Sequence, residues 1–430
     1  MKRGFLNSSK AKARPLGSPA PPAPAPNVII SKPPIGKQNV EVPEGYDSEL
    51  KLKEVHPSSG SVPGGITFTT VPFSGEPRTE CIFHPGSKEV LMRLPGFSQP
   101  MVMPVGRNSP IRVKEVPGMG LGRPLLVAAQ VLPTWVPPTF TPEQQGQYLL
   151  NHLEKFVAVA VGRMTDEDKA AYKALKNSHL EDGSGPLVGI LRTNGLGIEG
   201  LRPDVTDGSV AARCTGVCEK ISRLNHSCSP NVRTHWSMIT FSFQLFAVRD
   251  IAADEELTYL YTGIEGSTAQ RNEDLKPYDF VCTCSSCKDP KSDARRADLE
   301  KSGPPSISLW LFDDAPQATG RILDECRRQM AIIEREGMEA VFRYYEVLSV
   351  GFVVCVATGD AQSASEWARK LARIRWVEEV PKDIESFVDP NSRAYKTHPM
   401  WRKRFDRDSK ESWDAMMKGL TAMRLGGIIL

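Results

Sequence analysis

The sequence predicts an α+β fold in which β-rich segments come first and helices follow. Between Ile66 and Pro117, short runs such as Ile66-Thr-Phe-Thr-Thr-Val71 alternate with glycine and proline, a pattern typical of strands and turns. After Gly303 the pattern changes, and apolar residues at helical spacing lie near 316–336, 338–357 and 361–375. These two observations predict a β-rich core followed by an α-helical C-terminal lobe.

Length and composition are typical of a globular protein with two or three domains. The 430 residues are 40% hydrophobic, which is enough for an ordinary core. Lysine and arginine total 54 against 51 aspartate and glutamate residues, so the net charge favours neither a nucleic-acid nor a membrane partner. The longest apolar run, from Val347 to Ala357, is shorter than the ~20 residues of a membrane-spanning helix, and we predict that it forms a buried helix.

The N-terminal part of the chain is predicted to be a disordered tail at 1–45 and a β-rich segment at 46–110. The tail is rich in proline and holds little that could pack, so it is either an extended spacer or a proline-rich docking ligand. We expect no secretory signal after Met1, and we expect the nine cysteines to be ligands or core residues in a reducing compartment. We therefore expect the protein in the cytoplasm, the nucleus or both.

Two further elements are predicted in the middle of the chain. Thr141-Pro142-Glu143 combines a hydroxyl cap with proline at the first helical position, which predicts a helical insert at about 142–178. The run Thr240-Phe-Ser-Phe-Gln-Leu-Phe-Ala-Val248 first alternates between apolar and polar residues and then becomes apolar. That pattern predicts a strand that enters a core.

The cysteine spacing points to a metal site. Three thiols fall within six residues, at Cys282, Cys284 and Cys287, which suits tetrahedral zinc but leaves a closed structural site one ligand short. Cys228, in a turn-like Asn-His-Ser-Cys-Ser-Pro segment, is predicted to be the fourth ligand. The alternative is a set of unconnected buried thiols, which is how we interpret Cys214 and Cys218, near a helix.

Three motifs in fixed order carry a resemblance to a known family. Asn225-His226-Ser227-Cys228 comes first, Glu256-Leu257-Thr258 with Tyr261 comes second, and the Cys-x-Cys-x-x-Cys tail comes third. This order resembles the SET-domain signature and post-SET zinc site of protein-lysine methyltransferases. The chain is most similar to the fungal branch of SET-and-MYND-like proteins that lacks the MYND finger, because residues 111–222 hold no cysteine and histidine array of that kind.

The resemblance implies a particular domain order. A mostly β SET domain with a pseudoknot is expected at 111–268, and it encloses the helical insert. A post-SET zinc loop is expected at 269–290, and a helical C-terminal region at 304–430.

The resemblance also implies the residues of the site. The cofactor would be S-adenosyl-L-methionine, bound by Gly118, Gly120, Asn225 and His226. Tyr261 would be the catalytic phenol, and Tyr259 and Phe280 would line the channel that admits the substrate. Zn²⁺ on Cys228, Cys282, Cys284 and Cys287 would be structural.

The implied function is S-adenosylmethionine-dependent protein-lysine N-methylation of histones or other proteins by a monomer, without a membrane and without direct nucleic-acid binding. Transfer of a methyl group from a sulfonium requires a neutral amine aligned with it, whereas free lysine, with a pKa of ~10.4, is mostly protonated. A narrow aromatic channel would favour the neutral amine by removing water. The alternative interpretation of Tyr259 and Tyr261 is that they are two aromatic residues of a strand that pack in a core.

The glycine run departs from the family pattern. Gly118-Met-Gly120-Leu-Gly122 is followed directly by Arg123-Pro-Leu-Leu-Val127, so the strands expected after the glycine turn are missing. A skipped exon and a true deletion both explain this. The second leads to an alternative function, in which an impaired SET-domain protein acts as a peptide or protein interaction module.

Overall fold

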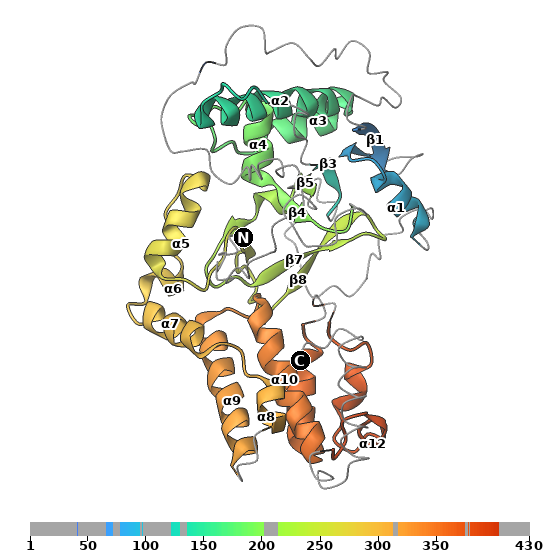
Figure 1. Cartoon of the computed structure of the whole chain (residues 1–430), viewed down its shortest axis with the longest axis vertical. Coiled ribbons are helices and arrows are strands. Elements are labelled where there is room, and N and C mark those ends of the chain that lie inside the picture. The colour runs from blue at the N-terminus through green and yellow to red at the C-terminus, as the bar shows by residue number, and fades with distance from the viewer. Residues whose placement is uncertain are drawn as a thin grey trace, which may run out of the picture. The chain divides into compact units, whose positions relative to one another are not determined.

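The computed structural model describes residues 41, 66–71, 78–94, 97, 122–129, 136–201, 214–312, 317–374, 377 and 379–403 (Figure 1). Apart from residue 41, the predicted proline-rich tail lies outside the described residues. The chain divides into two compact units, each made of separate segments. The first unit contains Met1–Arg223, Trp236–Gln244 and Pro277–Asp279, and the second contains Leu224–His235, Leu245–Lys276 and Phe280–Leu430. Helices and strands both occur in the described chain, as the α+β prediction requires.

The first unit is built on a five-stranded sheet. Its order is β1 (Thr67–Val71), β2 (Thr79–Phe83), β3 (Pro124–Ala129), β5 (Cys214–Cys218) and β4 (Leu196–Ile198). β2 and β3 run parallel, and the other neighbours run antiparallel. Strands β1 and β2, predicted to precede the SET domain, therefore share one sheet with later strands. The short helix α1 (Ser87–Arg93) is not part of the prediction, because the glycine and proline residues around it indicated turns.

The helical insert packs on this sheet. Within the predicted bounds of about 142–178 it consists of α2 (Pro142–Arg163) and α3 (Asp166–Lys173), and a further helix, α4 (Pro186–Asn194), follows beyond them. α2 begins where the capping sequence predicts: Thr141 Oγ1 accepts from the Gln144 amide, and Gln144 Oε1 accepts from the Thr141 amide. The buried face of α2 includes Phe156, whose ring stacks on Phe68 of β1 at 5.7 Å. Burial of such a side chain contributes about 1.5–3 kcal/mol.

The second unit pairs two short strands that lie far apart in the sequence. β6 (Asn225–His226) runs parallel to β9 (Thr258–Tyr259), with Asn225 opposite Thr258 and His226 opposite Tyr259. Between them in the chain, β7 (Val232–Ser237) and β8 (Ser242–Ala247) form a two-stranded sheet. The strand predicted at 240–248 is confirmed by β8, but its entry into a core is not, because Leu245 and Phe246 are half-buried and Ala247 is exposed.

Helices make up the rest of the second unit. They are α5 (Thr268–Leu275), α6 (Ser285–Lys288), α7 (Ser292–Ser302), α8 (Ile307–Phe312), α9 (Ala318–Glu336), α10 (Phe342–Thr358), α11 (Ala361–Leu371), η5 (Ile384–Phe387) and α12 (Ala394–Thr397). Figure 1 shows α9 and α10 as long neighbouring helices, drawn in orange. Two further 3-10 helices, η3 (Ile221–Arg223) and η4 (Lys276–Tyr278), belong wholly or mostly to the first unit.

The C-terminal helices follow the sequence pattern closely. α10 contains the apolar run Val347–Ala357, and every residue of that run is buried, so the predicted buried helix is confirmed. α9 ends at Gly337 with φ 63° and α10 ends at Gly359 with φ 77°, left-handed conformations that glycine adopts without strain. Within the described part of the chain, no helix combines the length and the apolar character needed to cross a membrane.

Candidate functional site

Asn231, which is 1% exposed, stabilises the pairing of β6 with β9. Its side-chain oxygen accepts from the Thr258 amide at 2.8 Å, and its backbone amide donates to the Thr258 carbonyl at 3.2 Å. Its side-chain amide donates to the Glu256 carbonyl and to the Glu255 carboxylate at 2.8 and 3.0 Å. One asparagine thereby satisfies the polar groups of two chain segments, so the segment that begins at Asn225 is fixed beside the segment that ends at Tyr261.

His226 connects the tyrosine to the cysteines. The Tyr261 amide donates to His226 Nδ1 at 3.1 Å, so that nitrogen must be an acceptor and the proton of the neutral ring lies on Nε2. Nε2 is 3.4 Å from Cys228 Sγ and can donate to it. Burial lowers the pKa of His226 to about 4, so the ring is neutral at physiological pH.

The predicted catalytic and channel residues lie together. Tyr261 Oη donates to the Leu224 carbonyl at 2.6 Å, which orients the phenol. The ring of Phe280 meets the rings of Tyr261 and His226, each at 6.1 Å between centroids, and Tyr259 lies 5.1 Å from Tyr261. Four aromatic rings from three chain segments therefore form one cluster, with Tyr259 only 8% exposed.

The predicted cofactor residues are only partly described. Asn225 is exposed, and its side-chain amide donates to Glu256 Oε1 at 2.6 Å. Gly118 and Gly120 lie outside the described residues. Of the glycine run, Gly122 is described: its φ is 71°, its carbonyl accepts from the Phe243 amide at 2.9 Å, and a Cβ there would lie 1.8 Å from the Phe243 carbonyl oxygen. This glycine is therefore required by its packing against β8.

The four cysteines predicted as ligands come together. Their sulfur atoms all lie within 4.8 Å of one another, and Cys228 Sγ is 3.8 Å from Cys282 Sγ and 3.6 Å from Cys287 Sγ. Four sulfurs at a Zn–S distance of about 2.3 Å on a tetrahedron lie about 3.8 Å apart. Hydrogen bonds from Cys228 and Cys282 lower the pKa of Cys284, which favours a thiolate. Spacing and donor type therefore fit zinc.

The other five cysteines, Cys81, Cys214, Cys218, Cys326 and Cys355, are buried free thiols outside this cluster. Cys214 and Cys218 are buried and lie near a helix, as predicted: they belong to strand β5, and the Cys218 amide donates to Ser222 Oγ of η3 at 3.0 Å. Cys218 Sγ donates to the Gly122 carbonyl at 3.7 Å. Their role is to pack the sheet of the first unit.

Sequence motifs did not indicate the charged residues around the cysteine cluster. Arg271 and Arg296 are each 1% exposed and are among the largest fully buried side chains of the described chain. Arg296 donates to the Cys228 carbonyl at 3.0 Å, and Arg271 donates to Cys287 Sγ at 3.6 Å. A buried arginine is rare, but no local pattern distinguishes it from an exposed one. Its role depends on which residues surround it in space.

Comparison with known proteins relates part of this chain to a known family. The SET-domain family matches residues 110–262. Histone-lysine N-methyltransferase set5 of Schizosaccharomyces pombe is 30% identical over 225 residues, which are 50% of this chain and 64% of that protein. Histone-lysine N-methyltransferase ASHR1 of Arabidopsis thaliana is 34% identical over 180 residues, 40% of this chain and 36% of that protein.

A shorter match involves Histone-lysine N-methyltransferase SMYD3 of Homo sapiens, which is 39% identical over 83 residues, 18% of each protein. The chain thus spans less than two thirds of the length of each of these relatives. The similarity thus includes proteins named as histone-lysine N-methyltransferases from a fungus, a plant and human.

Proposed function

From the premise that residues 110–262 of this chain are a SET domain related to histone-lysine methyltransferases, we propose that the protein methylates lysine side chains of other proteins. The observation that carries this proposal is the cluster of His226, Tyr259, Tyr261 and Phe280, in which the Tyr261 phenol is held by the Leu224 carbonyl. The methyl donor would be S-adenosylmethionine.

Asn225 and His226 are the described residues that would hold the donor, together with Gly118 and Gly120. Asn225 is exposed and carries an amide that Glu256 orients, and His226 is neutral and fixed by two hydrogen bonds. Neutral, oriented polar groups beside an aromatic wall suit a zwitterionic ligand with a flat base. When bound, the donor supplies an electrophilic methyl group on a sulfonium.

The protein's own contribution would be alignment and exclusion of water. The rings of Phe280 and Tyr261 pack edge to face, and the neighbouring Tyr259 is buried. An aliphatic lysine stem fits between such rings, and removal of water from its amino group favours the neutral, nucleophilic form. The Tyr261 hydroxyl, fixed at 2.6 Å from the Leu224 carbonyl, would then hold its position while the amine approaches.

We further propose that Cys228, Cys282, Cys284 and Cys287 hold one structural Zn²⁺, within a post-SET loop at 269–290. The sulfur spacing supports this assignment, and so does the surrounding loop, in which the Cys282 amide donates to Asn272 Oδ1 at 2.9 Å. Zinc would tie the segment that contains Asn225 and His226 to the loop that contains Phe280. Metal binding would therefore stabilise the aromatic cluster.

The substrate class and setting are proposed from the relatives. Since their names describe histone-lysine methyltransferases, histones or other lysine-bearing proteins are the proposed substrates, and the cytoplasm or nucleus the proposed location. The proposed SET domain at 111–268 would act as a monomer with the helical region at 304–430.

Titration calorimetry with S-adenosylhomocysteine on zinc-loaded protein tests the proposal first. We expect binding, followed by transfer of labelled methyl groups to a histone mixture. The variant Tyr261→Phe should reduce transfer at least about 100-fold, since the phenol can no longer orient the reacting groups, while the affinity for S-adenosylhomocysteine stays within about threefold. Tyr344→Phe is the matched control, because Tyr344 Oη donates to Glu334 at 2.7 Å within the C-terminal helices.

The alternative function makes a different prediction. A folded, zinc-loaded protein that fails to bind S-adenosylhomocysteine, but binds it once a family-typical hairpin is inserted after Gly122, would be an impaired form of an active enzyme. Failure of both proteins to bind would exclude methyl transfer and favour an interaction module.

A further inference from the structure

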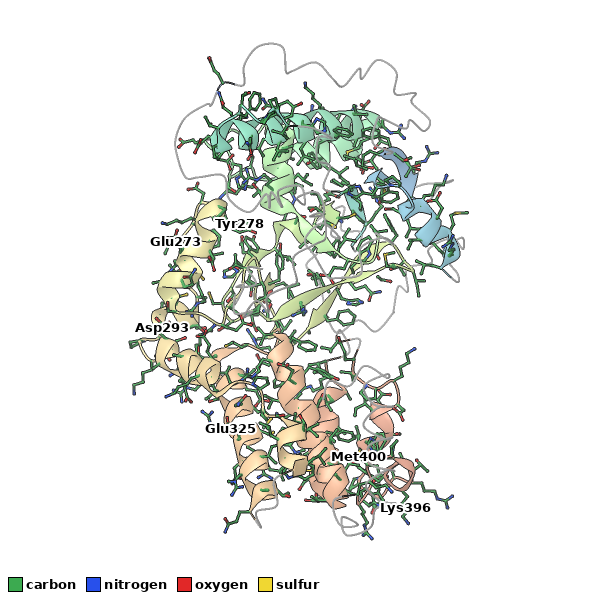
Figure 2. The ribbon with its side chains drawn as sticks, in the orientation of Figure 1. Glu273, Tyr278, Asp293, Glu325, Lys396 and Met400 are labelled. Carbon is green, nitrogen blue, oxygen red and sulfur yellow. The ribbon has the colours of Figure 1, made fainter. Side chains whose placement is uncertain are left out.

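The cysteine cluster lies beside two buried arginines whose charges are balanced in different ways. Arg296 is paired with Glu336 at 2.9 Å, and both side chains are at most 1% exposed. Arg271 has no buried carboxylate at that distance among the described residues. Its nearest carboxylate, Asp293, is 3.6 Å away and 45% exposed. Figure 2 labels Asp293, near the start of α7.

The remaining contacts of Arg271 direct its guanidinium toward sulfur. Nη1 donates to the Gly266 carbonyl, and Nη2 donates to Thr268 Oγ1 at 2.9 Å and to Cys287 Sγ at 3.6 Å. Asp293 Oδ1 already accepts from the amide and the hydroxyl of Thr268, both at 2.8 Å. The acceptor that Arg271 reaches in the cysteine cluster is therefore Cys287 Sγ.

The charge of a filled site explains why a buried cation belongs there. Four thiolates on one divalent zinc carry a net charge of about −2, and a buried charge is costly unless an opposite charge or hydrogen bonds offset it. Within the described residues, Glu336 uses its carboxylate on Arg296, Arg295 and Ser292. The Glu336 carboxylate is thus not available to balance the charge of Arg271, whereas the cysteine cluster is available.

We propose that Arg271 is a positioning residue of the zinc site, which donates an N–H···S hydrogen bond to Cys287 and offsets the negative charge of the tetrathiolate. This inference rests on the proposed zinc site and adds a residue outside the ligand set. Hydrogen bonding to a thiolate withdraws electron density from sulfur. Arg271 therefore strengthens zinc retention and protects Cys287 from electrophiles.

The test uses the full chain, loaded with one zinc per protein as measured by mass spectrometry of the metal. Competition with a chromophoric chelator gives the zinc affinity, and N-ethylmaleimide labelling with peptide mass spectrometry gives the alkylation rate of each cysteine. Arg271→Gln is expected to weaken zinc affinity by about 10- to 100-fold, the usual effect of removing an outer-shell partner. Cys287 should be alkylated faster by a similar factor.

Two further variants make the result specific. Arg327→Gln is the control, because it removes the same charge from α9 of the same unit, where Arg327 is 53% exposed and pairs with Asp324. Arg271→Lys keeps the charge but lacks the planar fork, so it should lie between parent and Arg271→Gln in both measurements. If Arg271→Gln does not fold, the same two measurements on Arg271→Lys test the proposal.

Different failures have different meanings. Parent protein that holds no zinc would overturn the zinc site itself, and this inference with it. Parent that holds zinc, with both Arg271 variants within about twofold of parent affinity, would overturn the inference alone. So would equal acceleration of alkylation at Cys326 and Cys355, which are buried in the C-terminal helices, because general loosening would then explain the effect.

Discussion

At the scale of single residues, His226 has a different partner on each ring nitrogen. The Tyr261 amide on Nδ1 requires the proton to lie on Nε2, and Nε2 faces Cys228 Sγ at 3.4 Å. The same imidazole therefore orients the backbone of the proposed catalytic residue and a proposed metal ligand. A histidine on a half-buried strand is ordinarily a satisfied core residue, and here that packing role and the proposed functional role coincide.

A second histidine provides a prediction about pH. Burial lowers the pKa of His398 to about 4, and its ring packs edge to face with Phe352 and Phe387. Because the folded-state pKa lies below the unfolded value of about 6.5, the unfolded chain binds more protons between these values. Stability contributed by the neutral ring is thus complete above pH 6.5 and is lost as pH falls toward 4.

His398→Asn removes this dependence, so the difference in melting temperature between parent and variant should shrink as pH is lowered from about 6.5 to about 4. Thermal denaturation of both proteins in the same buffers measures it, and the acid lability of the cysteine cluster cancels in the comparison. A difference that stays constant across this range would contradict the assigned pKa.

At the scale of elements, the end of α9 is built against the segment that contains Cys228. A Cβ on Gly337 would lie 2.7 Å from Ser229 Cβ. The carbonyl of Glu336 accepts from Ser229 Oγ and from Ser286 Oγ. The last carbonyl of α9 therefore binds two serines that lie next to proposed zinc ligands. Ser229 directly follows Cys228, and Ser286 lies two residues after Cys284.

Two glycines test this contact. Gly337→Ala and Gly359→Ala both place a side chain at a left-handed helix end, with φ 63° and 77°, and each should destabilise the protein by about 1–2 kcal/mol. Only Gly337→Ala also displaces Ser229, whereas Gly359→Ala meets the flexible side chain of Arg402. Denaturant unfolding and chelator competition should therefore show lost stability in both variants and weaker zinc binding in Gly337→Ala alone. Equal zinc affinity in the two variants would contradict the proposed coupling.

At the scale of the whole molecule, the compact units do not follow the order of the chain. The second unit collects 224–235, 245–276 and the residues from 280 onward. It contains the aromatic cluster, the four cysteines and both buried arginines. The sheet β1–β5 and the helical insert belong to the first unit. The proposed domain boundaries at 111–268, 269–290 and 304–430 thus describe order along the chain, while the compact units describe packing.

Zinc removal should therefore act on one unit. Hydrogen exchange measured by mass spectrometry, with and without a strong chelator, should show faster exchange in 225–231 and 282–296. The sheet strands β1–β5 should be protected as before, because none of their residues contributes a sulfur to the cluster. Uniform loss of protection would mean that the metal stabilises the whole chain.

The sequence by itself determined the features that local order encodes. The motif order from Asn225 to Cys287 indicated the SET family, Thr141-Pro142 predicted the start of α2, and the helical spacing near 316–336 and 338–357 predicted α9 and α10. The physical reason is that caps, periodicity and ligand spacing act between residues a few positions apart.

Only the tertiary structure decided which distant residues meet. It joined β2 to β3 in parallel, and it placed Arg271 and Arg296 beside the four cysteines. The energy of a buried charge depends on its surroundings in space, and Arg271 lies in a sequence no different from that of an exposed helical arginine. Long-range pairing decides whether such a residue faces solvent or sulfur.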